Sequence, residues 1–297
     1  MRSKWNTPDT RPIFVVGAGR SGTKFLMNIL NNSPYIHIAP EIHYFSSLVH
    51  EGFLKNLRRR VKRAGKFTLD ELVCCLQGTG HFGTYWRRGI QFPAREIAEW
   101  FGQVEINERS IHRFIIEKDY MENGGDKERV KYMGEKTPSN VFHLKRLFRW
   151  YPEATVLFIY RNPVDVLRSE VNKACKPDYP LPKGSLLYPY GLAVYVFCEW
   201  LAGAIIAVYY RLKRGDSLLI VSYEQLCCRT REITRRICGK IGVPYARGLC
   251  KVERIDSSYS RGTGRPHWHP PGWISLFYRI SLAIPIRILD GLSLGPQ

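Results

Sequence analysis

Residues 13–26 read IFVVGAGRSGTKFL. The apolar, β-branched run before Gly17 is typical of a buried strand in a parallel sheet. From residue 23 to 32 the apolar side chains recur at helical spacing. A glycine-rich loop between a strand and a helix presents backbone N–H groups and the positive end of the helix dipole to a ligand. The stretch therefore predicts an α/β fold with an anion site at residues 17–24.

The rest of the chain repeats the alternation of strand and helix. Further strands are predicted at 36–40, 155–160 and 217–223, and helices at 68–76, 192–213 and 230–242, with one more that opens at Asn162-Pro163. This alternation predicts a P-loop-like central parallel sheet with helices on both faces. We expect a polar leader at 1–11 and one domain over 12–297, whose last part, 267–297, is a C-terminal segment.

The amino-acid composition limits the class of protein and the kinds of ligand to be expected. The chain has 297 residues, 44% of them hydrophobic, and a formal net charge of +19. Such a composition excludes a disordered, collagenous or polytopic membrane protein, and the excess of basic residues favours anionic ligands. The eight cysteines include no C-x-x-C pair, so no zinc site is expected, and we infer a reducing compartment.

Two apolar segments bear on membrane contact. Residues 192–213 are long enough to span a bilayer, but Glu199 lies inside them and the flanking strands are expected to share one sheet, which favours a buried core helix. Residues 273–295 are interrupted by Arg279, Pro285 and Arg287, so packing as a core helix is favoured over contact with a membrane surface. With no signal-like N-terminus, the expected location is cytoplasmic, and peripheral membrane contact through 273–295 stays open.

The glycine loop has three interpretations. An ATP-binding Walker loop needs Lys before Ser or Thr, whereas this chain has Thr23-Lys24. A dinucleotide fingerprint fits Gly17, Gly19 and Gly22, with Glu41 placed 19 residues after the last glycine to hold a ribose. That second interpretation predicts an NAD(P)-dependent oxidoreductase and leaves Arg20 without a role.

The third interpretation is a resemblance. GAGRSGTKFL resembles the R-S-G-T-x-x-L loop of Golgi-type and tyrosylprotein sulfotransferases, which use 3′-phosphoadenosine 5′-phosphosulfate (PAPS). Four more segments resemble elements of that family in the same order: GEKTPSN at 134–140, YRNPVDVLRS at 160–169, VSYEQLC at 221–227 and IDSSYSRGTGRP at 255–266. Each segment alone is a weak signal, and their common order is the strong one.

The resemblance implies two phosphate sites for the donor. The 5′-phosphosulfate would bind Arg20 and the loop residues Ser21, Gly22, Thr23 and Lys24. The 3′-phosphate would bind Arg161 and Ser169, with Lys173 one helical turn further on. Tyr223 would contact the nucleotide, and Ser257, Ser258, Arg261 and Gly262 would cover it. No metal is needed, because basic side chains can stabilise the charge.

The resemblance also implies catalytic roles. Glu41 is the expected general base, with a pKa raised by partial burial, and His43 is the alternative. Lys136 of the E-K-x-P segment, with Arg20, would stabilise the transition state, and Glu135 is a candidate to orient Lys136. Residues 45–130 resemble nothing familiar and are the expected acceptor-binding region.

The sequence thus favours a PAPS-dependent sulfotransferase acting on a hydroxyl of a glycan, glycolipid or other metabolite, with no nucleic-acid partner. Besides the oxidoreductase, a non-catalytic module that binds polyanions through 58–63 and 87–88 remains as an alternative. The oligomeric state is left open.

Overall fold

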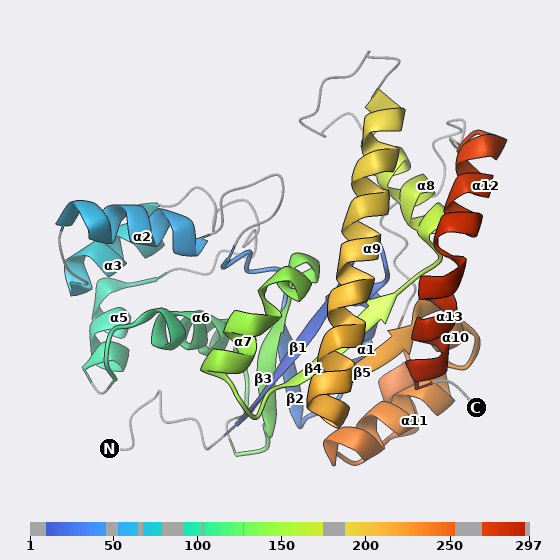
Figure 1. Ribbon diagram of the computed structural model, residues 1–297. Helices are drawn as coiled ribbons and strands as arrows, with labels where there is room; N and C mark the ends of the chain where they lie inside the picture. The colour runs from blue at the N-terminus through green and yellow to red at the C-terminus, as the bar shows by residue number, and fades with distance from the viewer. Residues whose placement is uncertain are drawn as a thin grey trace, which may run out of the picture. The chain divides into compact units, whose positions relative to one another are not determined.

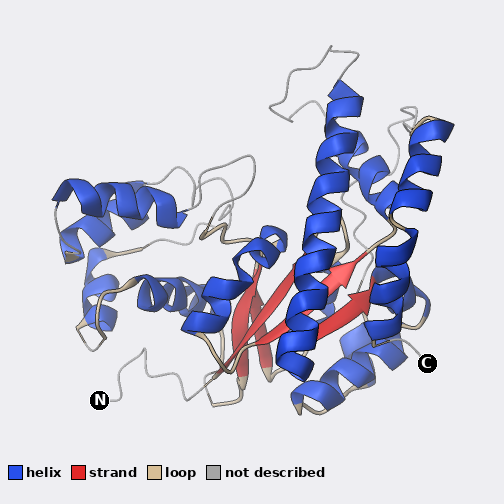
Figure 2. Cartoon of the chain, in the orientation of Figure 1, coloured by secondary structure: helices blue, strands red, loops and turns tan. Residues whose placement is uncertain are grey.

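Five parallel strands form one sheet in the order β2-β3-β1-β4-β5, flanked by helices (Figures 1 and 2). The computed structural model describes residues 10–45, 53–64, 68–78, 92–102, 104–126, 128–174, 188–252 and 269–294. The strands are β1 (Arg11–Gly17), β2 (Ile36–Ala39), β3 (Tyr132–Lys136), β4 (Thr155–Tyr160) and β5 (Leu218–Ser222). The predicted α/β fold with a parallel sheet is confirmed.

The strand β3 was missed by the sequence analysis, because its letters YMGEK contain no apolar run. It pairs in parallel with β2, with Ile36 opposite Tyr132 and Ala39 opposite Glu135. Gly134 explains the unusual composition: a Cβ atom there would lie 1.6 Å from the carbonyl oxygen of Ile13 in β1. Only glycine allows the two backbones to approach this closely.

Contacts divide the chain into two compact units, the first comprising the described residues of 1–14 and 33–154, the second those of 15–32 and 155–297. The prediction of a single domain over 12–297 stays a prediction. The helices of the first unit are α2 (Phe53–Ala64), α3 (Leu69–Gly78), α5 (Ala94–Phe101), α6 (Glu108–Glu122), η1 (Pro138–His143) and α7 (Leu144–Trp150).

In the first unit, α6 packs on β2 and β3. Its start is fixed by Asn107 and Ser110, which exchange hydrogen bonds between side chain and backbone in a capping box. The basic run 58–63 lies on α2, where Arg59, Arg60 and Lys62 are exposed. Arg58 forms an ion pair with Glu108. The run is therefore a solvated helix face.

The second unit contains α1 (Thr23–Asn31), α8 (Pro163–Ala174), α9 (Tyr188–Arg214), η2 (Gly215–Ser217), α10 (Tyr223–Cys228), α11 (Thr230–Ile241), η3 (Arg247–Cys250), α12 (Gly272–Ser281) and α13 (Ala283–Leu292). Gly242 is the C-cap of α11, and its left-handed φ of 72° ends the helix. The long helix α9 packs on α8, α13 and β5.

The prediction of a buried core helix at 192–213 describes one face of α9 only. That face carries the buried residues Ala193, Val196, Trp200, Ala204 and Ala207. By length and composition, Tyr190–Ser217 could cross a membrane. Within the structure, 33% of its most apolar window is buried, which is less than expected of the core helix that the sequence predicts. The helices α12 and α13, bent by 53° at the break between them, pass the same test only if they are taken together.

Candidate active site

The glycine loop and the start of α1 lie in the second unit. Gly22 is the N-cap of α1 with a left-handed φ of 94°, no side chain caps the helix, and its first turn holds no acidic residue. A Cβ atom on Gly22 would lie 2.2 Å from the ring of Tyr223, so the ring packs directly on the loop. The first N–H groups of α1 thus have no side-chain cap, which is the arrangement that the predicted anion site needs.

Arg20 connects this loop to the segment after β4. Its Nε donates a hydrogen bond to Ser169 Oγ at 3.1 Å, and Arg161 Nη1 donates to the Arg20 carbonyl oxygen at 3.4 Å. Arg20 has a φ of 60°, in the region that favours glycine. The structure therefore brings together the residues assigned to the two phosphate sites, and it does so with strained backbone of the kind found at functional sites.

Arg161 is held from two sides. Its guanidinium carbon lies 4.6 Å from the centroid of the Tyr223 ring, and Trp200 Nε1 donates to its carbonyl oxygen at 2.9 Å. Tyr223 is the first residue of α10 rather than the last of the strand. A cation–π contact with a half-buried ring keeps the guanidinium in place without neutralising it.

Acidic side chains also face this cluster. Glu170 lies 3.9 Å from Arg20 Nε and 3.8 Å from Lys173 Nζ. Glu199 of α9 accepts a hydrogen bond from the backbone N–H of Gly19 at 3.4 Å. Burial, reinforced by the charge of Glu170, raises the pKa of Glu199 to about 7. From the sequence, Glu199 served only as an argument against a membrane-spanning helix. An acidic residue inside an apolar helix is the signal that could have marked it as a candidate site residue.

The remaining residues assigned to the donor site differ in exposure. Ser21 is fully buried, and its Oγ has no hydrogen-bond partner within the described part of the chain. Thr23 is buried and Lys24 is exposed. An unsatisfied buried hydroxyl in an anion-binding loop is the kind of group that a bound phosphate satisfies. Ser257, Ser258, Arg261 and Gly262 lie outside the described residues.

A second cluster lies in the first unit. Glu41 follows β2, and Lys136 ends β3. Lys136 Nζ forms an ion pair with Glu41 Oε1, and His43 Nε2 lies 3.1 Å from Glu41 Oε2. His43 has a left-handed φ of 51°. The structure thus joins the expected base, the alternative base and the expected transition-state lysine in one contact group.

The charge state of Glu41 differs from the expectation. Burial would raise its pKa, but the ammonium group of Lys136 and the hydrogen bond from His43 outweigh burial and hold the pKa below its ordinary value. Glu41 is therefore an ionised carboxylate, able to accept a proton.

Glu135 does not contact Lys136 through the hydrogen bonds described. Its carboxylate lies 2.8 Å from His112 Nε2 and accepts from Thr137 Oγ1 at 2.6 Å and Asn140 Nδ2 at 2.8 Å. Successive side chains of a strand point to opposite faces, which turns Glu135 away from its neighbour. Its place is in a fully buried network that anchors the turn after β3.

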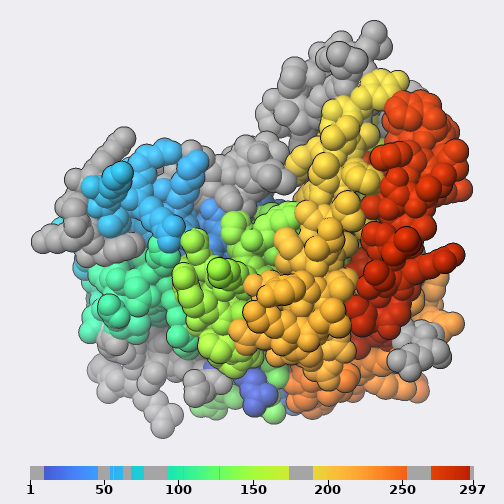
Figure 3. Space-filling model, in the orientation of Figure 1, coloured from blue at the N-terminus to red at the C-terminus, as the bar shows by residue number. Residues whose placement is uncertain are grey.

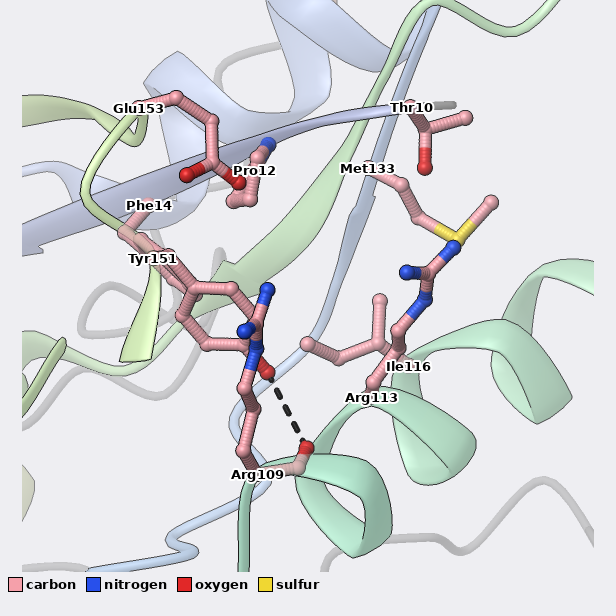
Figure 4. A pocket seen from close by; sticks show the side chains of 9 residues that line it. All are labelled: Thr10, Pro12, Phe14, Arg109, Arg113, Ile116, Met133, Tyr151 and Glu153. Atoms are coloured by element: carbon pink, nitrogen blue, oxygen red, sulfur yellow. Dashed lines mark hydrogen bonds between the residues drawn. The ribbon is translucent and has the colours of Figure 1, made fainter. Parts of the chain in front are cut away.

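A small pocket of about 80 Å³ in the first unit holds none of the predicted site residues (Figure 4). It is lined by Thr10, Pro12, Phe14, Arg109, Arg113, Ile116, Met133, Tyr151 and Glu153. Thr10 and Pro12 lie at the start of β1, whereas ligands of parallel sheets bind beyond the carboxyl ends of the strands. Within the described residues, no group of three or more His, Cys, Asp or Glu side chains could hold a metal ion.

Comparison with known proteins gives one family. The sequence model described as "Sulfotransferase family" matches residues 12–247. Curated proteins give no match. Among solved structures, a sulfotransferase from Alicyclobacillus acidocaldarius superimposes with a TM-score of 0.55 at 16% identity, covering 97% of this chain and 98% of that one.

The sulfotransferase domain of the Synechococcus PCC 7002 olefin synthase gives a TM-score of 0.53 at 17% identity, covering 99% of this chain and 100% of that one. At such identities these two likenesses show the fold. The family match favours the third interpretation of the glycine loop over the dinucleotide fingerprint and the polyanion-binding module.

Replacing Lys136 by Met should raise the pKa of Glu41, because burial then acts without the opposing ammonium charge. We expect a ¹³C NMR titration of the carboxyl groups, assigned with Glu41→Gln, to show the Glu41 signal titrating at a higher pH in the variant. Lys145→Met, which removes an exposed lysine of α7, is the matched control and should leave the signal unchanged. An unaltered Glu41 titration in Lys136→Met would contradict the ion pair.

Proposed function

The chain belongs to the sulfotransferase family, and we propose that it transfers the sulfuryl group of PAPS to a hydroxyl group of its acceptor. The observation that carries this proposal is the contact of Arg20 with both Ser169 and Arg161, beside the uncapped start of α1. A donor with phosphate at 3′ and phosphosulfate at 5′ needs two anion sites, and these residues supply cationic and N–H donors for both.

The residues that would bind the donor belong to the second unit. Arg20, Ser21, Gly22, Thr23 and Lys24 would hold the 5′-phosphosulfate. In the segment after β4, Arg161, Ser169 and Lys173 would hold the 3′-phosphate, and Tyr223 would contact the nucleotide. Binding would exchange the contacts of Arg20 and Lys173 with Glu170 for contacts with phosphate.

Glu41 and Lys136 would carry out the transfer step. In the proposed reaction the acceptor oxygen attacks sulfur in line with the bond to the 5′-phosphate oxygen. Glu41 takes the hydroxyl proton, and the S–O bond to the phosphate breaks, leaving adenosine 3′,5′-bisphosphate. Lys136 and Arg20 stabilise the negative charge that develops on the leaving oxygen. Transfer of Lys136 away from Glu41 would raise the basicity of the carboxylate at the moment when it receives the proton.

The acceptor we propose is a glycan, a glycolipid or another hydroxyl-bearing metabolite, in the cytoplasm or at its membrane surface. The region 45–130, which includes α2, α3 and α5, would bind it. Ser257, Ser258, Arg261 and Gly262 would cover the nucleotide, as the family resemblance implies.

Loss of Arg161 should weaken donor binding. We expect Arg161→Ala to raise the dissociation constant of adenosine 3′,5′-bisphosphate by roughly 10- to 100-fold, because a charge-assisted hydrogen bond to phosphate is removed. Calorimetric titration without magnesium measures this, with NAD and ATP as comparison ligands. Arg231→Ala removes an exposed arginine of α11 and should bind like the wild type. Preference for NAD, or equal binding by both variants, would overturn the donor assignment.

Glu199 should make donor binding depend on pH. Below its pKa of about 7 the side chain is neutral, and above it a carboxylate opposes the anion at Gly19. The affinity of the wild type for adenosine 3′,5′-bisphosphate should therefore fall, relative to Glu199→Gln, as the pH rises from 6 to 8. The ratio of the two dissociation constants removes the ligand's own ionisation. Glu232→Gln on α11, a half-buried carboxylate away from the glycine loop, is the control. A ratio that is constant with pH would refute the role of Glu199.

Glu41→Gln should slow sulfuryl transfer strongly while leaving donor binding intact. A general base contributes about 10²- to 10⁴-fold to the rate, so we expect kcat to fall by at least about 100-fold with ³⁵S-labelled PAPS and the best of a panel of sugar, glycolipid and phenolic acceptors. Glu128→Gln removes an exposed carboxylate and should keep full activity. If Glu41→Gln stays active and His43→Gln does not, the base is His43.

A further inference from the structure

One surface of the second unit is apolar although it faces outward. Among the described residues, every exposed large hydrophobic side chain except Val104 lies on α9, α12 or α13. The six most exposed, each at least 60% accessible, are Val194, Ile205, Leu212, Trp273, Ile280 and Ile284. Apolar residues scattered singly on a surface need no explanation, whereas a concentration on neighbouring helices marks an interaction site.

These helices lie side by side, so their outer residues form one face. The rings of Tyr190 and Trp273 stack with centroids 6.0 Å apart, and Phe197 and Phe277 lie 5.2 Å apart. Farther along, α13 packs on α9. Figure 3 shows α9 in yellow and gold next to α12 and α13 in red on the visible surface. We call the outward residues of α9, α12 and α13 the outer apolar face.

The fold does not need this face, because the same helices pack on their own unit through other residues. Trp200 of α9 and Leu289 of α13 are buried. Tyr278 of α12 donates a hydrogen bond to the carbonyl oxygen of Ala193. A helix that is apolar on its outer side, although its inner side is already packed, is typical of a surface that another molecule covers.

The charges on these helices indicate what covers the face. Their acidic residues are Glu199, which accepts a hydrogen bond from the Gly19 N–H, and Asp290, which is exposed but accepts a hydrogen bond from the Tyr160 hydroxyl. Basic residues remain exposed: Arg279 on α12, Arg287 on α13 and, near the end of α9, Lys213 and Arg214. Exposed cations among apolar and aromatic side chains complement a layer of anionic headgroups above hydrocarbon.

We propose that the outer apolar face docks on the surface of an anionic lipid bilayer. Attachment is peripheral, since each helix keeps its inner side packed on the second unit. A second copy of this chain is a poorer occupant, because it would bring the same exposed arginines and a further net charge of +19. The proposal goes beyond sulfuryl transfer and does not rest on it.

Vesicle co-sedimentation of the full chain tests the proposal. The wild type should bind vesicles of phosphatidylcholine with about one third phosphatidylglycerol at least tenfold more tightly than pure phosphatidylcholine vesicles. Ile280→Glu with Ile284→Glu should lower that binding by at least tenfold. The matched control is Val104→Glu, which changes a 41% exposed residue of the first unit and should leave binding unchanged. Circular dichroism and thermal unfolding verify that the variants are folded.

Two further measurements distinguish the contribution of the basic residues from that of the apolar residues. Arg279→Glu with Arg287→Glu should abolish the preference for the anionic vesicles. Brominated lipid should quench tryptophan fluorescence in the wild type and quench it less in Trp273→Phe, because Trp273 would reach the acyl chains.

Three outcomes would overturn the proposal. The first is a wild type that sediments with neither kind of vesicle. The second is equal loss of binding in Val104→Glu and in the double glutamate variant. The third is a dimer in light scattering that the double glutamate variant dissociates, which would assign the face to a second copy of the chain.

Discussion

The uncapped start of α1 is the constraint around which the second unit is built. Its N–H groups and the nearby guanidinium groups of Arg20 and Arg161 concentrate positive charge at one place. Such a cluster must be balanced when no anion is bound, and Glu170 and Glu199 provide that balance from α8 and α9. The pKa of Glu199 is raised in spite of these cations, because burial and the charge of Glu170 both disfavour its carboxylate.

In the first unit a comparable balance holds Glu41 and Lys136. Each neutralises the other in the free protein, and each has a separate task in the proposed reaction. The neighbouring Glu135 shows how one strand can serve two purposes. Alternation along β3 turns Glu135 into a buried network with His112, while Lys136 faces Glu41. The buried hydrogen bonds of Glu135 on one face of β3 therefore help to hold Lys136 in position on the other face.

The helix α9 has one side at the glycine loop and the other on the outer surface of the second unit. Trp200 supports the Arg161 carbonyl, Glu199 reaches Gly19, and Val194 and Ile205 face outward. An interaction at the outer apolar face therefore acts on the same helix that contacts the anion site.

The sequence by itself determined the parallel α/β fold, four of the five strands and the family motifs, because buried runs and glycine loops are local patterns. The family resemblance also assigned Arg20, Arg161 and Ser169 to donor binding, and the structure brings these three residues together. Only the tertiary structure showed β3, whose strand character depends on the approach of Ile13 to Gly134. Likewise, the ionised state of Glu41, the contact of Glu199 with Gly19 and the exposed side of α9 depend on neighbours far away in the sequence. Burial and charge are set by contacts in space, which residue order alone does not contain.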